Sequence, residues 1–205
     1  MATKLIYRSS LLYETVMRLL YGRHYQARSQ AVAGLIPPDC SVVDLCCGPG
    51  LLYREYLKAK DIDYTGLDAS PFFVRKLTQQ GIPALLWDLN SARPLPRADY
   101  LIMQSALCYF LPDPSSIIGR MLDAARRAII IAEPIRNLST SRFSLLRQCA
   151  IKLSGPPGEH PKRFTEETLD RFFSNYAEEL REKFLIPGGR EKVYLLAPTP
   201  VFRQA

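Results

Sequence analysis

The sequence predicts an α/β fold in which strands and helices alternate around one core. Short apolar runs end in or near acidic residues at Asp44, Asp68 and Asp88, and stretches with helical apolar spacing lie between them. This order is expected of a mostly parallel sheet covered by helices. The chain has 205 residues, of which 47% are hydrophobic, so it can bury a substantial core. We therefore expect a single domain over residues 1–205.

The first strand and the turn after it carry the clearest motif. Residues 42–50 are predicted to form a buried strand that ends in the acidic residue Asp44 and breaks into a tight glycine turn, and residues 51–58 have helical apolar spacing. Glycines let the backbone approach a ligand, and the start of a helix presents unpaired N–H groups. A strand, a glycine turn and a helix in this order are typical of a nucleotide cradle.

The turn does not match the common phosphate-binding motifs. The dinucleotide fingerprint needs a third glycine where Tyr53 stands. A P-loop needs Gly-Lys-Ser/Thr, whereas Leu51 and Leu52 follow this turn. Asp44, four residues before Gly48, would repel a pyrophosphate but can hold an ammonium group. These residues favour a cationic cofactor without phosphate and leave a nicotinamide-dependent reductase as a distant alternative.

The pattern Asp44-x-x-x-Gly48-x-Gly50 resembles motif I of the class I S-adenosylmethionine-dependent methyltransferases, and the resemblance extends over most of the chain. It implies a Rossmann-like three-layer sandwich with a seven-stranded, mostly parallel sheet, an antiparallel C-terminal strand and an N-terminal helical cap. The implied cofactor is S-adenosylmethionine, and S-adenosylhomocysteine is the product. The small-molecule type is favoured, because no Asn/Asp-Pro-Pro-Tyr/Phe sequence of the DNA enzymes follows the fourth strand.

The resemblance also implies a set of cofactor contacts. Asp68 ends the second strand, over residues 62–68, where it is expected to accept the ribose hydroxyls. Asp88, near the end of the third strand, is expected to accept the adenine amino group, or else to cap its own loop. Tyr25 and Arg28 are expected at the methionine end, with ordinary surface positions as the alternative. The predicted cofactor residues are Asp44, Cys46, Cys47, Gly48, Pro49, Gly50, Asp68, Ala69, Asp88, Leu89, Gln104, Tyr25 and Arg28.

The catalytic residue is left open by the sequence. The fourth strand begins at Ala98 and runs into a loop, in which Cys108 and Tyr109 stand where many relatives have histidines. Glu133 ends the fifth strand, over residues 128–134, and either lines the substrate cavity or caps a neighbouring backbone. A general base is needed only if the attacking lone pair of the acceptor is protonated. The candidates are Tyr25, Tyr109, Glu133 and His160.

Segments outside the central strands complete the predicted domain. Residues 1–38 form an N-terminal helical cap, with helices at about 11–20 and 23–35, and residues 135–163 form a lid-like insertion. A helix over residues 142–153 suits a lid over the pocket or, alternatively, a membrane surface. The last predicted elements are a helix that begins at Thr165 and a β-hairpin at the edge of the sheet.

The charge distribution and the composition indicate which ligands and which cellular location to expect. The net charge of +7 is concentrated in residues 1–40 and 120–163, which favours an anionic substrate, a membrane surface or nucleic acid. Five cysteines without a Cys-x-x-Cys pair and only two histidines argue against a metal site. No apolar run approaches the roughly 20 residues of a membrane span, and the N-terminus lacks a signal-peptide core, so we expect a cytoplasmic protein.

The resemblance implies methyl transfer from S-adenosylmethionine, by in-line displacement, to a small acceptor, and the basic segments favour an anion as this acceptor. RNA or protein methylation is the second choice. A non-catalytic cofactor-binding or scaffold protein of the same fold is the alternative from another class. The sequence leaves open the acceptor atom, the pathway and the oligomeric state.

Overall fold

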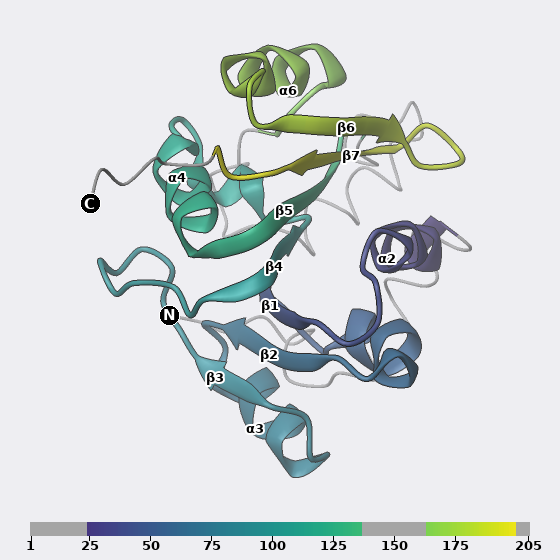
Figure 1. Cartoon of the computed structure of the whole chain (residues 1–205), viewed down its shortest axis with the longest axis vertical. Coiled ribbons are helices and arrows are strands. Elements are labelled where there is room, and N and C mark those ends of the chain that lie inside the picture. Colours follow the sequence, from purple (N-terminus) through teal and green to yellow (C-terminus); the bar gives the residue numbers. More distant parts are fainter. Residues whose placement is uncertain (1–23, 137–162, 200–205) are drawn as a thin grey trace, which may run out of the picture.

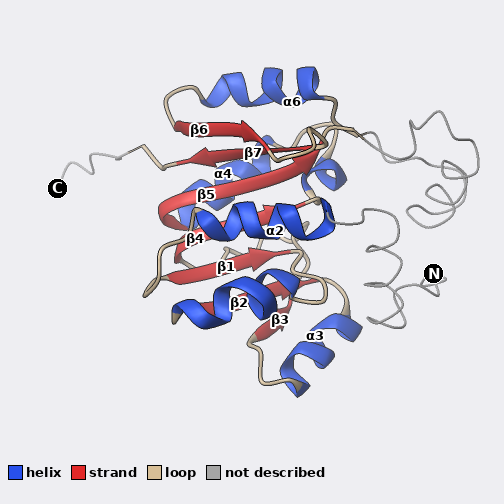
Figure 2. Cartoon of the chain, turned by 90° about the vertical axis from the view of Figure 1, so that its right-hand side faces the viewer, coloured by secondary structure: helices blue, strands red, loops and turns tan. Residues whose placement is uncertain are grey.

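The computed structural model describes residues 24–136 and 163–199, which build one seven-stranded sheet with helices on both faces (Figures 1 and 2). The strands are β1 (Ser41–Leu45), β2 (Asp63–Asp68), β3 (Ala84–Leu86), β4 (Ala98–Gln104), β5 (Ala125–Pro134), β6 (Leu180–Leu185) and β7 (Glu191–Leu196). The α-helices are α2 (His24–Gly34), α3 (Pro71–Gln79), α4 (Ser115–Ala124) and α6 (Glu166–Phe173).

The strand order is β3-β2-β1-β4-β5-β7-β6. Strands β1 to β5 run parallel to one another, whereas β7 is antiparallel to both β5 and β6. Among the strands that the structure describes, β7 alone therefore opposes the common direction, and β6 and β7 form the hairpin at the sheet edge. This arrangement confirms the predicted Rossmann-like sandwich with an antiparallel C-terminal strand.

The sheet separates two buried clusters because successive side chains of a strand point to opposite faces. On one face, Leu101 and Met103 of β4 pack in the cluster that includes α4 and α6. On the other face, Ile102 packs in the cluster that includes α2. The order of the strands changes direction between β1 and β4, and the carboxyl ends of these neighbouring strands form the usual ligand-binding edge of an open α/β sheet.

Three elements differ from the prediction by more than one residue at an end or in the type of helix. Strand β5 begins at Ala125 rather than at residue 128, because Ala125 already pairs with Ala98 of β4. Strand β3 ends at Leu86, two residues before Asp88, which the sequence places near the end of this strand, because only residues 84–86 pair with β2. The regular helix expected after the glycine turn is instead a π-helix over Tyr53–Leu57, followed by a 3₁₀ turn over Lys58–Lys60.

The structure describes some of the helices predicted outside the central strands and not others. Helix α2 occupies the stretch predicted at about 23–35, and α6 begins at a capping box in which Thr165 and Thr168 bond each other's backbone N–H. The helices predicted at about 11–20 and 142–153 lie outside the described residues. Within residues 24–136 and 163–199, we find no helix with the length and apolar character that crossing a membrane requires.

Asp170 joins α6 to the C-terminal hairpin, and its loss is expected to lower the free energy of unfolding. Its carboxylate accepts hydrogen bonds from Lys192 Nζ (2.8 Å) and the Tyr194 hydroxyl (2.9 Å), and both partners are buried. Asp170→Ala is expected to cost about 2 kcal/mol, because it removes one of the two carboxylates that pair with Lys192, the other being Glu166, and it removes the acceptor of the buried Tyr194 hydroxyl.

Urea unfolding measures this loss, and Glu167→Ala is the control on the same helix. The Glu167 side chain is 81% exposed and pairs with Arg171 across one turn, so its removal is expected to cost less than about 0.5 kcal/mol. Equal costs for the two variants would contradict the proposed link between α6 and the hairpin.

Candidate functional site

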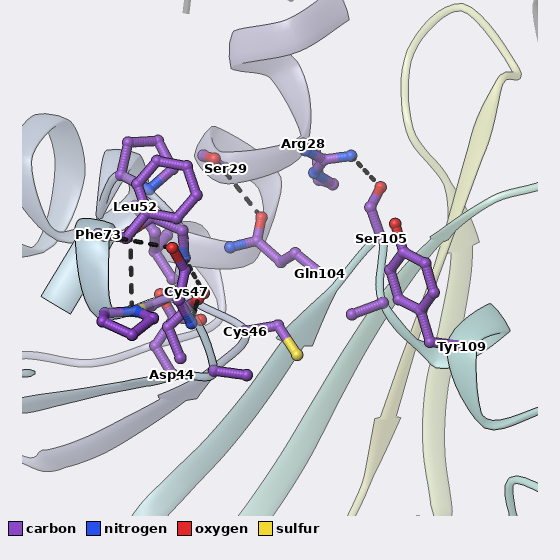
Figure 3. Close-up of a pocket in the computed structure, with 17 residues that line it drawn as sticks. Arg28, Ser29, Asp44, Cys46, Cys47, Leu52, Phe73, Gln104, Ser105 and Tyr109 are labelled. Atoms are coloured by element: carbon purple, nitrogen blue, oxygen red, sulfur yellow. Dashed lines mark hydrogen bonds between the residues drawn. The ribbon is translucent and has the colours of Figure 1, made fainter. Parts of the chain in front are cut away.

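A cavity of about 490 Å³ opens at the carboxyl ends of β1, β2 and β4, beneath α2 (Figure 3). Its lining comes from four regions that are distant in sequence: α2, the turn after β1, the start of α3 and the loop after β4. The lining residues are Arg28, Ser29, Asp44, Cys46, Cys47, Gly48, Pro49, Leu52, Asp68, Ala69, Ser70, Pro71, Phe73, Gln104, Ser105, Ala106 and Tyr109.

The cavity brings together most of the predicted cofactor residues. The predicted residues in its lining are Asp44, Cys46, Cys47, Gly48, Pro49, Asp68, Ala69, Gln104 and Arg28. Several lining residues were not predicted, among them Ser29, Ser70 and Phe73. Ser70 and Phe73 follow Asp68 at the start of α3, and Ser29 follows Arg28 in α2. Their closeness in sequence to predicted residues is the signal that could have identified them.

Three predicted residues lie outside the lining. Gly50 is buried in the turn itself. Asp88 is exposed, and its Oδ1 accepts hydrogen bonds from the backbone N–H and side-chain amide of Asn90, as expected of a residue that caps its own loop. Leu89 is buried in the core, and its carbonyl accepts a hydrogen bond from Arg120. The adenine contacts of Asp88 and Leu89 stay predictions.

The four catalytic candidates have different positions. Tyr109 is 58% exposed at the cavity and stands beside Ser105 (Figure 3). Glu133 is 1% exposed and not part of the lining; its Oε2 accepts a hydrogen bond from the Leu107 N–H, so the backbone-capping alternative is the one observed. Burial raises the pKa of Glu133 to about 7. His160 and the side chain of Tyr25 lie outside what the structure describes.

The turn after β1 depends on backbone conformations that favour glycine. Gly48 has φ = +54° and Gly50 has φ = +70°. A Cβ on Gly50 would lie 2.7 Å from Leu77 Cδ2, so glycine at this position allows the turn to pack on α3. A Cβ on Gly48 would meet no atom within 4 Å. Gly48 therefore presents bare backbone to open space at the cavity, as a nucleotide cradle requires.

Asp68 ties two loops of the site together. Its Oδ2 accepts a hydrogen bond from the Gly48 N–H (2.8 Å), and its Oδ1 accepts one from the Ser70 N–H (2.8 Å). Burial raises the pKa of Asp68, and the two N–H donors oppose that increase. Each carboxylate oxygen has a second lone pair, so Asp68 retains acceptor capacity for ligand hydroxyls.

Asp44 brings a buried carboxylate to the cavity, and Arg28 brings a cation. Asp44 is 2% exposed, and burial raises its pKa to about 7, although Arg28 acts to lower it. The Arg28 guanidinium donates from Nη1 to Ser105 Oγ and to Glu191 Oε1, so α2 is joined to the β4 loop and to β7 (Figure 3 shows the bond to Ser105).

The charges of the described lining fit a ligand with an ammonium group and a carboxylate. Asp44 and Asp68 provide two carboxylates, and Arg28 is the single Lys or Arg side chain in the described lining. An ammonium group beside Asp44 would offset the cost of its burial. Among residues 24–136 and 163–199, no three His, Cys, Asp or Glu side chains are grouped as metal ligands.

The sheet order and the site at its edge define a class I S-adenosylmethionine-dependent methyltransferase fold. The family model described as "Methionine biosynthesis protein MetW" matches residues 26–154, which is more than half of the chain, and the chain belongs to that family.

Relatives and solved structures agree with this class. The trans-aconitate 2-methyltransferase of Mycobacterium tuberculosis is 34% identical over 112 residues, which are 53% of this chain and 42% of the relative. The match thus spans less than half of that relative's length.

Two solved structures share the fold over nearly the whole chain. A chain from a complex that contains the Haloferax volcanii Trm112 methyltransferase activator superposes with a TM-score of 0.68 at 14% identity, over 97% of this chain and 100% of the other. The magnesium protoporphyrin IX methyltransferase of Synechocystis, solved with bound S-adenosylhomocysteine, gives 0.62 at 16% identity, over 93% of this chain and 95% of the other. At these identities the likeness shows the fold alone.

Proposed function

We propose that this chain transfers a methyl group from S-adenosylmethionine to a small acceptor. The observation that carries the proposal is the buried Asp44 carboxylate in the cavity wall, next to the open backbone of Gly48. A buried carboxylate is costly unless a cation pairs with it, and the ammonium and sulfonium groups of this cofactor are cations. The fold and the family support the same cofactor.

Each part of the cavity has a role in this proposal. Asp44 binds the ammonium group, Arg28 binds the carboxylate, and Asp68 accepts the ribose hydroxyls while it holds the Gly48 turn. The bound cofactor supplies an electrophilic methyl carbon, to which the acceptor's lone pair bonds while the carbon–sulfur bond breaks and its electron pair stays on sulfur. The residues of the cavity hold the acceptor in line with the methyl group and exclude water.

The acceptor is proposed to be a small anion. The support comes from the relative named trans-aconitate 2-methyltransferase, whose named substrate is a small carboxylate. The described lining contributes only Arg28 as a cation, and that residue is already assigned to the cofactor. Tyr109, which lies at the cavity, is the described candidate for contact with the acceptor.

Methyl transfer from labelled S-adenosylmethionine tests this function. The acceptors are trans-aconitate, other small di- and tricarboxylates, neutral small molecules, total RNA and a protein extract. Transfer to a carboxylate supports the proposal. Transfer to RNA or protein alone would replace the acceptor class, and cofactor binding without transfer to any of these acceptors would favour a non-catalytic protein.

The affinity for S-adenosylhomocysteine is expected to fall as the pH falls through about 7, which is the pKa that burial gives Asp44. Below this pH, Asp44 gains a proton and loses its attraction for the ligand ammonium group. The dissociation constant is expected to rise towards about tenfold per pH unit on the acid side.

Calorimetric titration from about pH 5.5 to about pH 8.5 measures this dependence. The comparison ligand is 5′-methylthioadenosine, which keeps the nucleoside but lacks the amino and carboxyl groups. Its affinity is expected to change much less over the same range. Identical pH profiles for the two ligands would show that Asp44 does not bind the ammonium group.

A further inference from the structure

Tyr64, which is not part of the cavity lining, makes a hydrogen bond to Asp44 in the cavity wall. Tyr64 lies on β2, is 2% exposed and donates its hydroxyl hydrogen to Asp44 Oδ2 at 3.0 Å. Tyr64 and Asp44 come from neighbouring parallel strands, whose register pairs Tyr64 with Val42 and Gly66 with Asp44. The tyrosine side chain therefore extends along the sheet by two residues to reach the carboxylate.

Gly66 leaves the space that this hydroxyl occupies. A Cβ on Gly66 would lie 3.2 Å from the Tyr64 hydroxyl oxygen and 2.7 Å from Cys47 Sγ, which also occupies this space. The second distance is shorter than side chains tolerate, so an alanine at this position would displace one of these groups. The absence of a side chain at Gly66 thus leaves room for Cys47 Sγ and for the Tyr64 hydroxyl beside Asp44.

The ring of Tyr53 packs against the ring of Tyr64. The two rings are stacked, with centroids 4.4 Å apart and an interplanar angle of 25°. Tyr53 begins the π-helix after the glycine turn and stands where a dinucleotide-binding protein has its third glycine. Here the Tyr53 ring packs on Tyr64, whose hydroxyl bonds Asp44, whereas the third glycine of a dinucleotide site packs helix against strand.

We propose that Tyr64 is the positioning residue for Asp44, and that its hydroxyl holds the carboxylate ionised and oriented towards the ammonium group of the cofactor. The inference rests on the proposed function, since it assigns that ammonium group to Asp44. A hydrogen bond to a carboxylate favours its charged form, and only the charged form attracts the ligand. The Tyr64 hydroxyl stays a donor, because burial raises its pKa well above the ordinary value.

The groups around Asp44 set the direction of the expected effect. Arg28 of α2 favours ionisation of Asp44, and Asp68 at the end of β2 opposes it. The thiols of Cys46 and Cys47 lie in the adjoining turn, and burial raises their pKa, so they remain neutral. Within the described residues, Tyr64 is the side chain with a hydrogen bond to Asp44, so its removal is expected to raise the pKa of Asp44.

Tyr64→Phe tests the inference, with S-adenosylhomocysteine and 5′-methylthioadenosine as the two probes in calorimetric titrations. The variant is expected to bind S-adenosylhomocysteine about tenfold more weakly at neutral pH, as expected for loss of a hydrogen bond to a charged group. Its affinity for 5′-methylthioadenosine is expected to be unchanged. The midpoint of the pH dependence for S-adenosylhomocysteine is expected to shift to higher pH.

Further variants separate a positioning role from a structural one. Tyr176→Phe is the matched control: Tyr176 lies in the turn after α6 and is not part of the cavity lining, so the variant is expected to bind both ligands as the parent does. In an Asp44→Asn background, Tyr64→Phe is expected to cause no further loss for S-adenosylhomocysteine. Tyr53→Gly, which removes the ring that stacks on Tyr64, is expected to weaken binding of S-adenosylhomocysteine.

The outcomes distinguish this inference from the proposed function. If the parent protein binds neither ligand, the proposed function fails first. If the parent binds both, then an equal loss of both ligands in Tyr64→Phe indicates damage to the fold, and no loss of either indicates that Asp44 does not depend on Tyr64. Each of these two results would overturn the inference, as would a further loss in the Asp44→Asn background.

Discussion

Asp68→Ala is expected to weaken binding of both S-adenosylhomocysteine and 5′-methylthioadenosine by more than about 100-fold. The carboxylate accepts the N–H groups of Gly48 and Ser70, and in the proposed complex it also accepts the ribose hydroxyls. A hydrogen bond to a charged group contributes about 1.5–3 kcal/mol, and the variant loses several of them together. Because both ligands carry the ribose, both are expected to be affected equally, unlike in Tyr64→Phe.

Calorimetric titration measures this loss, and thermal unfolding shows whether the variant is folded. Asp63→Ala is the control, since Asp63 begins the same strand but is exposed at the opposite end from the cavity. The control is expected to bind both ligands normally. An Asp68→Ala protein that is folded and keeps the parental affinity would show that the nucleoside does not lie at the end of β2.

Gly48→Val is expected to abolish ligand binding, which is the second large effect. The backbone at Gly48 has φ = +54°, where a β-branched residue is strained, and the added side chain would enter open space at the cavity. In the proposed complex that space holds the ligand. The loss of binding is therefore expected to exceed what the backbone strain alone would cause.

Gly81→Val separates strain from obstruction of the cavity. Gly81 also has a left-handed backbone, with φ = +72°, and a Cβ there also meets no atom within 4 Å, but it follows α3 away from the cavity lining. Both variants are expected to lose similar stability in thermal unfolding, whereas only Gly48→Val is expected to lose ligand. Loss of binding in both variants, or in neither, would contradict the assignment of Gly48 to the cradle.

The fold was predictable because its signals are local. Apolar runs that end in or near Asp44, Asp68 and Asp88 mark parallel strands, and the Pro-Gly-Gly turn marks the final hairpin. The start of β5 was placed too late because Arg126 and Arg127 are exposed near the beginning of the strand and interrupt the apolar pattern. The π-helix at Tyr53 was missed because its wide turn has no clear signal in apolar spacing.

The site was predictable where sequence neighbours share a loop, and less so where distant residues meet. The turn after β1 and the end of β2 fall in the cavity lining as expected. The contact of Arg28 with Glu191 joins residues 163 positions apart, and the contact of Tyr64 with Asp44 depends on strand register and on the missing side chain of Gly66. Such contacts follow from the packed sheet rather than from any short motif.

Direct titration of the protein with S-adenosylmethionine, S-adenosylhomocysteine and NADH tests the central claim most directly. The buried Asp44 beside the Gly48 turn favours a cationic ligand without a pyrophosphate. We therefore expect the first two ligands to bind, with an affinity that Asp68→Ala removes, and NADH not to bind. Binding of NADH without binding of S-adenosylhomocysteine would contradict the account and identify a dinucleotide site instead.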